Sequence, residues 1–156
     1  MRRWLPLTCA LAVLSGCGTA APATDAAGPT AGPTTDYSTV DSQYRGIQVG
    51  LNLPPGVTFP AHLPSAAGTY QANAGRVAAQ NFWLCAWLRA YLTSDAGAAA
   101  QVPKYSRMDA YTEALDAQGR SAVDAAIRGV RSGTKAPVTA FVTTSCGGPF
   151  YGAAHS

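Results

Sequence analysis

The chain has 156 residues, of which 47% are hydrophobic and only 12% are charged, and its formal net charge is +3. A chain of this length is typical of one domain. A weak charge that is scattered along the sequence gives no basic face, which nucleic-acid binding would require. We therefore expect a single small folded domain that does not bind nucleic acid.

The first residues have the three-part pattern of an export signal. Arg2 and Arg3 precede an apolar stretch, residues 4–14, and small residues follow it. This stretch is too short for a stable transmembrane helix, which needs about 20 residues. Removal of the signal would leave nine basic residues (11 minus 2) against eight acidic ones, a net charge near +1.

The signal ends in Leu14-Ser15-Gly16-Cys17. These four residues resemble the lipobox of bacterial lipoproteins, which has a branched apolar residue, two small residues and a cysteine. The resemblance implies cleavage after Gly16, so that residues 1–16 are the signal peptide, and a thioether-linked diacylglyceryl group on Cys17. Two or three acyl chains anchor a protein stably. We therefore expect Cys17 to hold the protein at the extracytoplasmic face of the cell membrane; the alternative is an ordinary secretory signal cleaved near residues 20–23.

Residues 17–44 form the predicted tether between this anchor and the folded domain, residues 45–156. The first part of the tether is rich in alanine, proline, threonine and glycine. Such a composition buries too little apolar surface to offset the entropy of ordering the chain. Its threonines are also typical of glycosylated linkers, although unmodified linkers have the same composition.

The strongest apolar segment is Gln80–Leu92, which contains no proline or glycine. Its apolar side chains fall on nearly every side of a helix, which predicts a helix at the centre of the core. The segment would cover only about 20 Å, so we interpret it as a core helix and not a membrane span.

Other segments predict the elements around this helix. Alternating apolar residues favour a strand or extended arm at residues 47–53, and β-branched residues favour a strand at 138–144 that pairs with it. Three- and four-residue apolar spacing favours a second helical region at residues 107–131, bent or broken at Gly119 with Ser121 as a new cap. The predicted fold class is α+β and mainly helical, with a central apolar helix, a second bent or broken helical region and one or two short strands, pinned by a disulfide.

Two cysteines remain in the folded domain, Cys85 and Cys146. In an exported protein such a pair is typical of a disulfide, and this one would close a loop of about 60 residues, worth roughly 4 kcal/mol. The alternative is two separate buried thiols. A nucleophilic Cys85 would need a free thiol and a base, and we expect no metal site or cofactor because no Cys or His cluster has ligand spacing.

The sequence contains no recognisable catalytic motif. The charged residues at positions 116, 120, 124 and 128 are typical of a solvated helix face, and His62 lies in a proline-rich loop. Two tryptophans on one helix of a small domain are difficult to bury together, so an exposed Trp83 or Trp87 beside Arg89 is the best candidate for a ligand or partner contact.

The functional hypothesis is a non-enzymatic envelope protein that binds or scaffolds an envelope ligand or a protein partner. One alternative is an enzyme acting on envelope polymers, for which a cleft that collects carboxylates with His62 would be the sign. The other is an accessory subunit of a membrane complex, for which an exposed apolar patch around the two tryptophans would be the sign.

Overall fold

Helices make up most of the described chain, residues 32–65 and 68–152 of a computed structural model. The elements in chain order are strand β1 (Thr34–Thr35), helix α1 (Tyr37–Gln48), strand β2 (Tyr70–Gln71), helices α2 (Ala74–Leu92) and α3 (Ala98–Gln101), the 3-10 helix η1 (Val102–Arg107), the π-helical turn η2 (Ala110–Ala114), and helices α4 (Ala117–Ser132), α5 (Lys135–Ser145) and α6 (Pro149–Gly152).

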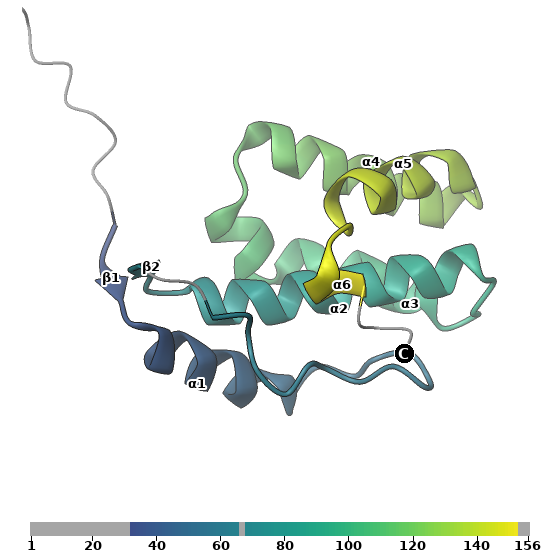
Figure 1. Cartoon of the computed structure of the whole chain (residues 1–156). Helices are drawn as coiled ribbons and strands as arrows, with labels where there is room; N and C mark the ends of the chain where they lie inside the picture. Colours follow the sequence, from purple (N-terminus) through teal and green to yellow (C-terminus); the bar gives the residue numbers. More distant parts are fainter. Residues whose placement is uncertain (1–31, 66–67, 153–156) are drawn as a thin grey trace, which may run out of the picture. The chain divides into compact units, whose positions relative to one another are not determined.

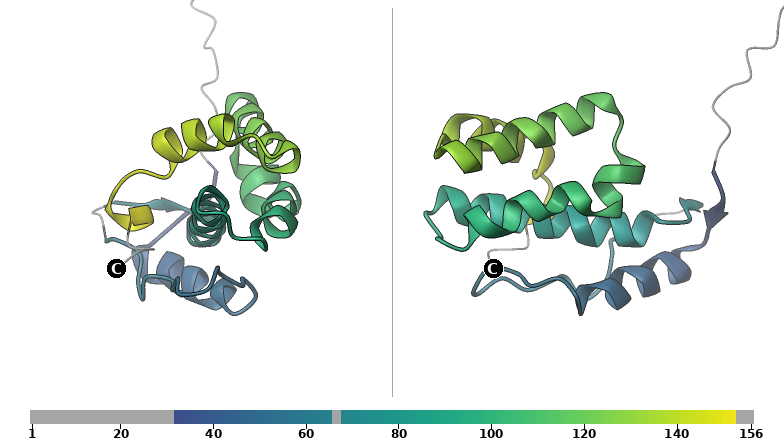
Figure 2. Two further views of the ribbon diagram at one scale, coloured as in Figure 1. Left: turned by 90° about the vertical axis from the view of Figure 1, so that its right-hand side faces the viewer. Right: turned by 180° about the vertical axis from the view of Figure 1, so that it is seen from behind.

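Helix α2 lies between α1 on one side and the α4–α5 pair on the other (Figure 1), an order that the view from behind also shows (Figure 2). Every side chain from Phe82 to Leu88 is buried. The helix contains the predicted segment Gln80–Leu92 and ends there, with Thr93 as its C-cap. Because its neighbours lie on opposite sides, an apolar stripe on one face alone would leave one of them without a packing surface.

A close approach of two backbones joins α1 to α2. Asp36 caps α1 by accepting a hydrogen bond from the backbone N–H of Thr39 at 2.8 Å. Gly75, in the first turn of α2, lies directly against α1. A Cβ built on Gly75 would be 2.0 Å from the carbonyl oxygen of Val40 and 2.9 Å from the backbone nitrogen of Tyr44. Only glycine allows this crossing.

The predicted strand or arm at residues 47–53 is wrong. Ile47 and Gln48 complete α1, whose buried residues Val40 and Tyr44 follow helical spacing, and the chain then leaves the helix. Val49 is 93% exposed, although Leu51 and Leu53 do pack against the core. The alternating pattern extends across the end of α1, so its first two residues follow the helical period and the rest lie in the loop after the helix.

The predicted strand at residues 138–144 is also wrong, because these residues belong to α5. Val138 is fully buried, and Phe141 and Val142 pack against the core at the i+3 and i+4 positions. Helical spacing on one face therefore outweighed the strand preference of β-branched residues.

Helices α4 and α5 form a hairpin around Gly133, which has a φ of 74° at the end of α4. A Cβ on Gly129 would be 2.6 Å from Cγ of Pro137. The two helices therefore meet closely near their connection.

The second helical region begins earlier and breaks elsewhere than predicted. It starts with η1 at Val102, and the break lies at Leu115 and Asp116. Asp116 caps α4 by accepting the backbone N–H of Gly119 at 2.7 Å. Gly119 is therefore in the first turn of α4, and Ser121 is inside the helix.

The sheet has two strands, β1 and β2, which pair antiparallel with Thr34 opposite Gln71. The predicted pairing of residues 47–53 with 138–144 is therefore wrong. Ordered structure also begins before the predicted tether boundary at residue 44, since α1 starts at Tyr37. The predicted signal peptide, Cys17 and the tether up to residue 31 lie outside the described residues. Among the described helices, none is both long and apolar enough to cross a membrane.

Candidate functional site

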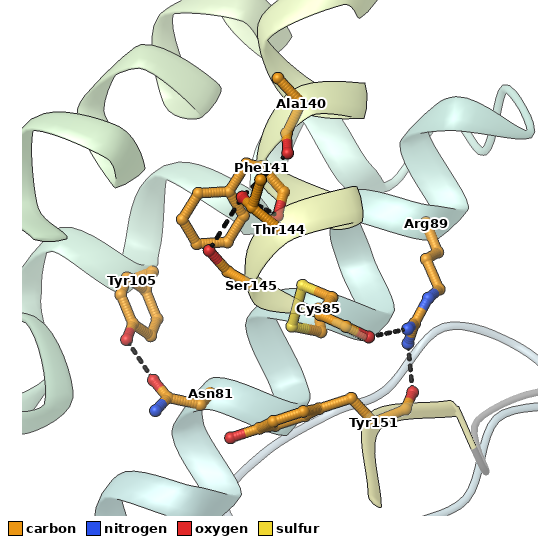
Figure 3. The surroundings of a disulfide bond; sticks show 10 residues. Asn81, Cys85, Arg89, Tyr105, Ala140, Phe141, Thr144, Ser145 and Tyr151 are labelled. Carbon is orange, nitrogen blue, oxygen red and sulfur yellow. Dashed lines mark hydrogen bonds between the residues drawn. A yellow bond between two sulfur atoms is a disulfide. The ribbon is translucent and has the colours of Figure 1, made fainter. Parts of the chain in front are cut away.

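A disulfide joins Cys85 in the middle of α2 to Cys146, directly after α5 (Figure 3). The two Cα atoms lie 5.6 Å apart, within the usual range for a disulfide. The predicted pairing is confirmed. The bond fixes the end of α5, and the chain that follows it, to α2.

Arg89 lies one helical turn after Cys85 and holds the same C-terminal segment. Its guanidinium donates hydrogen bonds to the backbone carbonyls of Cys146 and Tyr151 (Figure 3). Burial lowers the pKa of Arg89. The predicted contact residue Arg89 therefore positions the C-terminal segment.

A pocket of about 140 Å³ lies beside the disulfide. Helix α2 contributes one wall, η1 and α4 a second, and α5 with the C-terminal segment a third. The residues that line it are Asn81, Leu84, Cys85, Tyr105, Leu115, Gly119, Ala122, Val123, Phe141, Ser145 and Tyr151.

The polar groups of the pocket gather around Asn81. The Tyr105 hydroxyl donates a hydrogen bond to Oδ1 of Asn81, and Tyr151 lies on the other side of the same amide (Figure 3). Burial raises the pKa of Tyr105 and of Tyr151, while a side-chain hydrogen bond with Asn81 opposes the shift at Tyr151. Both phenols therefore stay neutral at physiological pH, and the pocket has an uncharged polar end.

The two tryptophans do not form a surface contact site. Trp83 is 2% exposed and Trp87 is 5% exposed. Their indole N–H groups both donate to the backbone carbonyl of Asn52, at 2.8 and 2.9 Å. The prediction of an exposed tryptophan is wrong because the loop after α1 covers this face of α2.

His62 lies close to a carboxylate, but at α1 and not in the pocket. Its Nδ1 is 2.8 Å from Oδ2 of Asp41, a residue that is 5% exposed. The same carboxylate accepts hydrogen bonds from Nε of Arg45 and from the backbone N–H of Leu63. The side chain of His62 is 64% exposed.

The charged residues at positions 116–128 do not pair with one another. Asp116 caps α4, Asp124 accepts a hydrogen bond from the Tyr111 hydroxyl at 2.9 Å, and Arg120 donates to the carbonyl of Thr112 at 3.4 Å. These three residues serve local structure. Within the described ranges, no three metal-binding side chains lie together.

Sequence reasoning missed the pocket, although one signal for it was available. Asn81, Cys85 and Arg89 are spaced by four residues and share one face of a mostly apolar helix. A row of polar and cysteine residues on such a helix marks the face that meets polar partners. Tyr105, Phe141 and Tyr151 gave no such signal, because the tertiary fold brings them together.

Comparison of this chain with protein-family models, with curated proteins and with solved structures finds no match in any of the three.

Proposed function

We propose that this protein is a lipid-anchored binding module at the extracytoplasmic face of the cell membrane, and that the pocket beside the disulfide holds its ligand. The observation that carries the proposal is the gathering of an amide and two phenols at one end of a mostly apolar pocket. Small-molecule sites typically combine apolar walls with a few convergent polar groups.

The sequence supports the location of this module. Leu14-Ser15-Gly16-Cys17 resembles a lipobox, and a disulfide is typical of proteins in an oxidising compartment outside the cytoplasm. The disulfide also stabilises the pocket, since Cys85 is part of its wall.

Metabolic labelling with an alkyne fatty acid in a bacterial host tests the anchor. The wild-type protein should take up the label and partition into detergent. Cys17→Ser should lose the label, whereas Cys9→Ser, a matched change within the predicted signal peptide, should keep it. Labelling of Cys17→Ser at the wild-type level would refute the anchor.

An enzyme acting on envelope polymers is the second candidate, and the contact between His62 and Asp41 favours it. A carboxylate beside an imidazole orients the ring for general-base catalysis. If the protein were such an enzyme, it would release soluble fragments from purified cell wall, and His62→Gln would abolish the release. Absence of fragments with the wild-type protein would leave the binding module as the better account.

An accessory subunit of a membrane complex is the third candidate. Its expected sign was an apolar patch around Trp83 and Trp87, and both side chains are buried. Purification from native membranes with a stoichiometric membrane partner would support it.

A further inference from the structure

The walls of the pocket are aromatic and aliphatic. Phe141, Tyr105 and Tyr151 contribute rings, and Leu84, Leu115 and Val123 contribute aliphatic side chains. Aromatic rings attract one another in offset-stacked or edge-to-face arrangements, worth about 1 kcal/mol beyond burial. Cys85 adds polarisable sulfur surface that favours an aromatic neighbour. Such walls favour a flat ring over a flexible chain.

The volume sets the size of the ligand. The pocket measures about 140 Å³. An apolar protein cavity of roughly 150 Å³ holds a benzene molecule. A single ring therefore fills the pocket, and a small substituent can extend through its open side.

The polar end sets the charge of the ligand. None of the side chains that line the pocket is ionised at neutral pH. Burial of a charged ligand without a counter-charge costs far more than hydrogen bonds to neutral groups return. The amide oxygen of Asn81 already accepts the Tyr105 hydroxyl, and a hydrogen bond also joins the Asn81 side chain to Tyr151. The second N–H of the amide and the remaining hydrogen-bonding capacity of the Tyr151 hydroxyl are left to meet a ligand.

We propose that the pocket binds an uncharged, single-ring aromatic molecule that carries a hydroxyl group, with the ring against Phe141 and the hydroxyl against Asn81 and Tyr151. The inference rests on the proposed binding function and names the ligand class of that site.

A second hollow provides a matched control. It is a groove of about 260 Å³ between α4 and α5, and it shares only Ala122 and Phe141 with the pocket. Ser145 lines the pocket alone and Ala140 the groove alone, and both are small, exposed positions on α5. Ser145→Trp should block the pocket, whereas Ala140→Trp should fill the groove.

Isothermal titration calorimetry of the mature protein with p-cresol tests the proposal. Toluene lacks the hydroxyl and should bind on the order of fivefold more weakly. Benzoate is charged and should bind on the order of a hundredfold more weakly. Cyclohexanol keeps the hydroxyl without the aromatic ring and should also bind more weakly than p-cresol.

The variants locate the binding. Ser145→Trp should abolish p-cresol binding, and Ala140→Trp should leave it unchanged. Tyr151→Phe, which keeps the ring, should weaken p-cresol by about fivefold without affecting toluene. Circular dichroism of each variant checks that it folds.

Three results would overturn the proposal: benzoate binding as tightly as p-cresol, equal binding by the two tryptophan variants, or no binding of any probe at millimolar concentration. The last result would refute the proposed ligand class but not the lipid anchor, because the fatty-acid labelling of Cys17 tests the anchor independently.

Discussion

Asp41 is a nearly buried carboxylate that joins α1 to the loop after it. It accepts hydrogen bonds from the backbone of Leu63 at 2.9 Å and from Arg45 at 3.1 Å, and its Oδ2 lies 2.8 Å from Nδ1 of His62. The hydrogen bond with His62 is the main cause that holds the pKa of Asp41 below its ordinary value of 3.8, although burial opposes it. The ionised form is therefore the one that stabilises the fold.

The Asp41→Asn variant tests this role. The unfolded state binds the proton more tightly, so the stabilisation is fully present above about pH 4 and is lost as the pH falls through the lower pKa of the folded state. We expect Asp41→Asn to lose about 2 kcal/mol at pH 7. Urea unfolding at several pH values should show a smaller acid-induced loss in the variant than in the wild type. An identical acid limb in both proteins would contradict the assignment.

The two tryptophans of α2, Trp83 and Trp87, report on the burial of this helix. The one other tryptophan of the chain, Trp4, lies in the predicted signal peptide. Because Trp83 and Trp87 are covered by the loop after α1, acrylamide should quench the native fluorescence several-fold less than the fluorescence in denaturant. Strong quenching of the native protein would show that this loop does not cover them.

The crossing of α1 and α2 depends on one glycine. A Cβ at position 75 would collide with backbone atoms, which cannot move as a flexible side chain can. We expect Gly75→Ala to lose about 2 kcal/mol or more of the free energy of unfolding, measured by urea denaturation.

Gly46, in α1, is the matched control. A Cβ there meets nothing within 4 Å. Gly46→Ala should therefore be neutral or should stabilise the protein by about 0.5–1 kcal/mol, as alanine favours helix. Equal losses at both glycines would contradict the close helix contact.

The elements differ in how well the sequence predicted them. Gln80–Leu92 was recognisable because its apolar composition is dense and uninterrupted by glycine or proline. The two strands were predicted from short local patterns. At residues 138–144 tertiary packing favoured helix, as the burial of Val138 illustrates, whereas at residues 47–53 the pattern ran across the end of α1. The break before α4 was misplaced because the cap at Asp116 was overlooked.

At the scale of the whole molecule, the disulfide is the main covalent constraint. It links residues 61 positions apart and connects α2 to the C-terminal segment that completes the pocket. Removing it with Cys85→Ala and Cys146→Ala together should cost roughly 4 kcal/mol. Calorimetry should show a fall in Tm on the order of 15 °C. Dithiothreitol should lower the Tm of the wild type and leave that of the double variant unchanged.

The sequence marked only the α2 wall of the pocket, and the other walls could not be predicted from it. Its walls come from five elements that are distant in the chain, and one residue, Tyr151, reaches it only because Arg89 and the disulfide hold the C-terminal segment. The pairing of Cys85 with Cys146 was predictable, because only these two cysteines remain once Cys9 and Cys17 are assigned to the predicted signal peptide and lipidation site.

The most direct test of the central claim is the intact mass of the protein purified from bacterial membranes without reductant. The account predicts a chain that begins at Cys17, carries a diacylglyceryl group there, and is lighter by two hydrogens because Cys85 and Cys146 are joined. A chain with an unmodified Cys17, or one in which alkylation labels Cys85 and Cys146 without prior reduction, would contradict it.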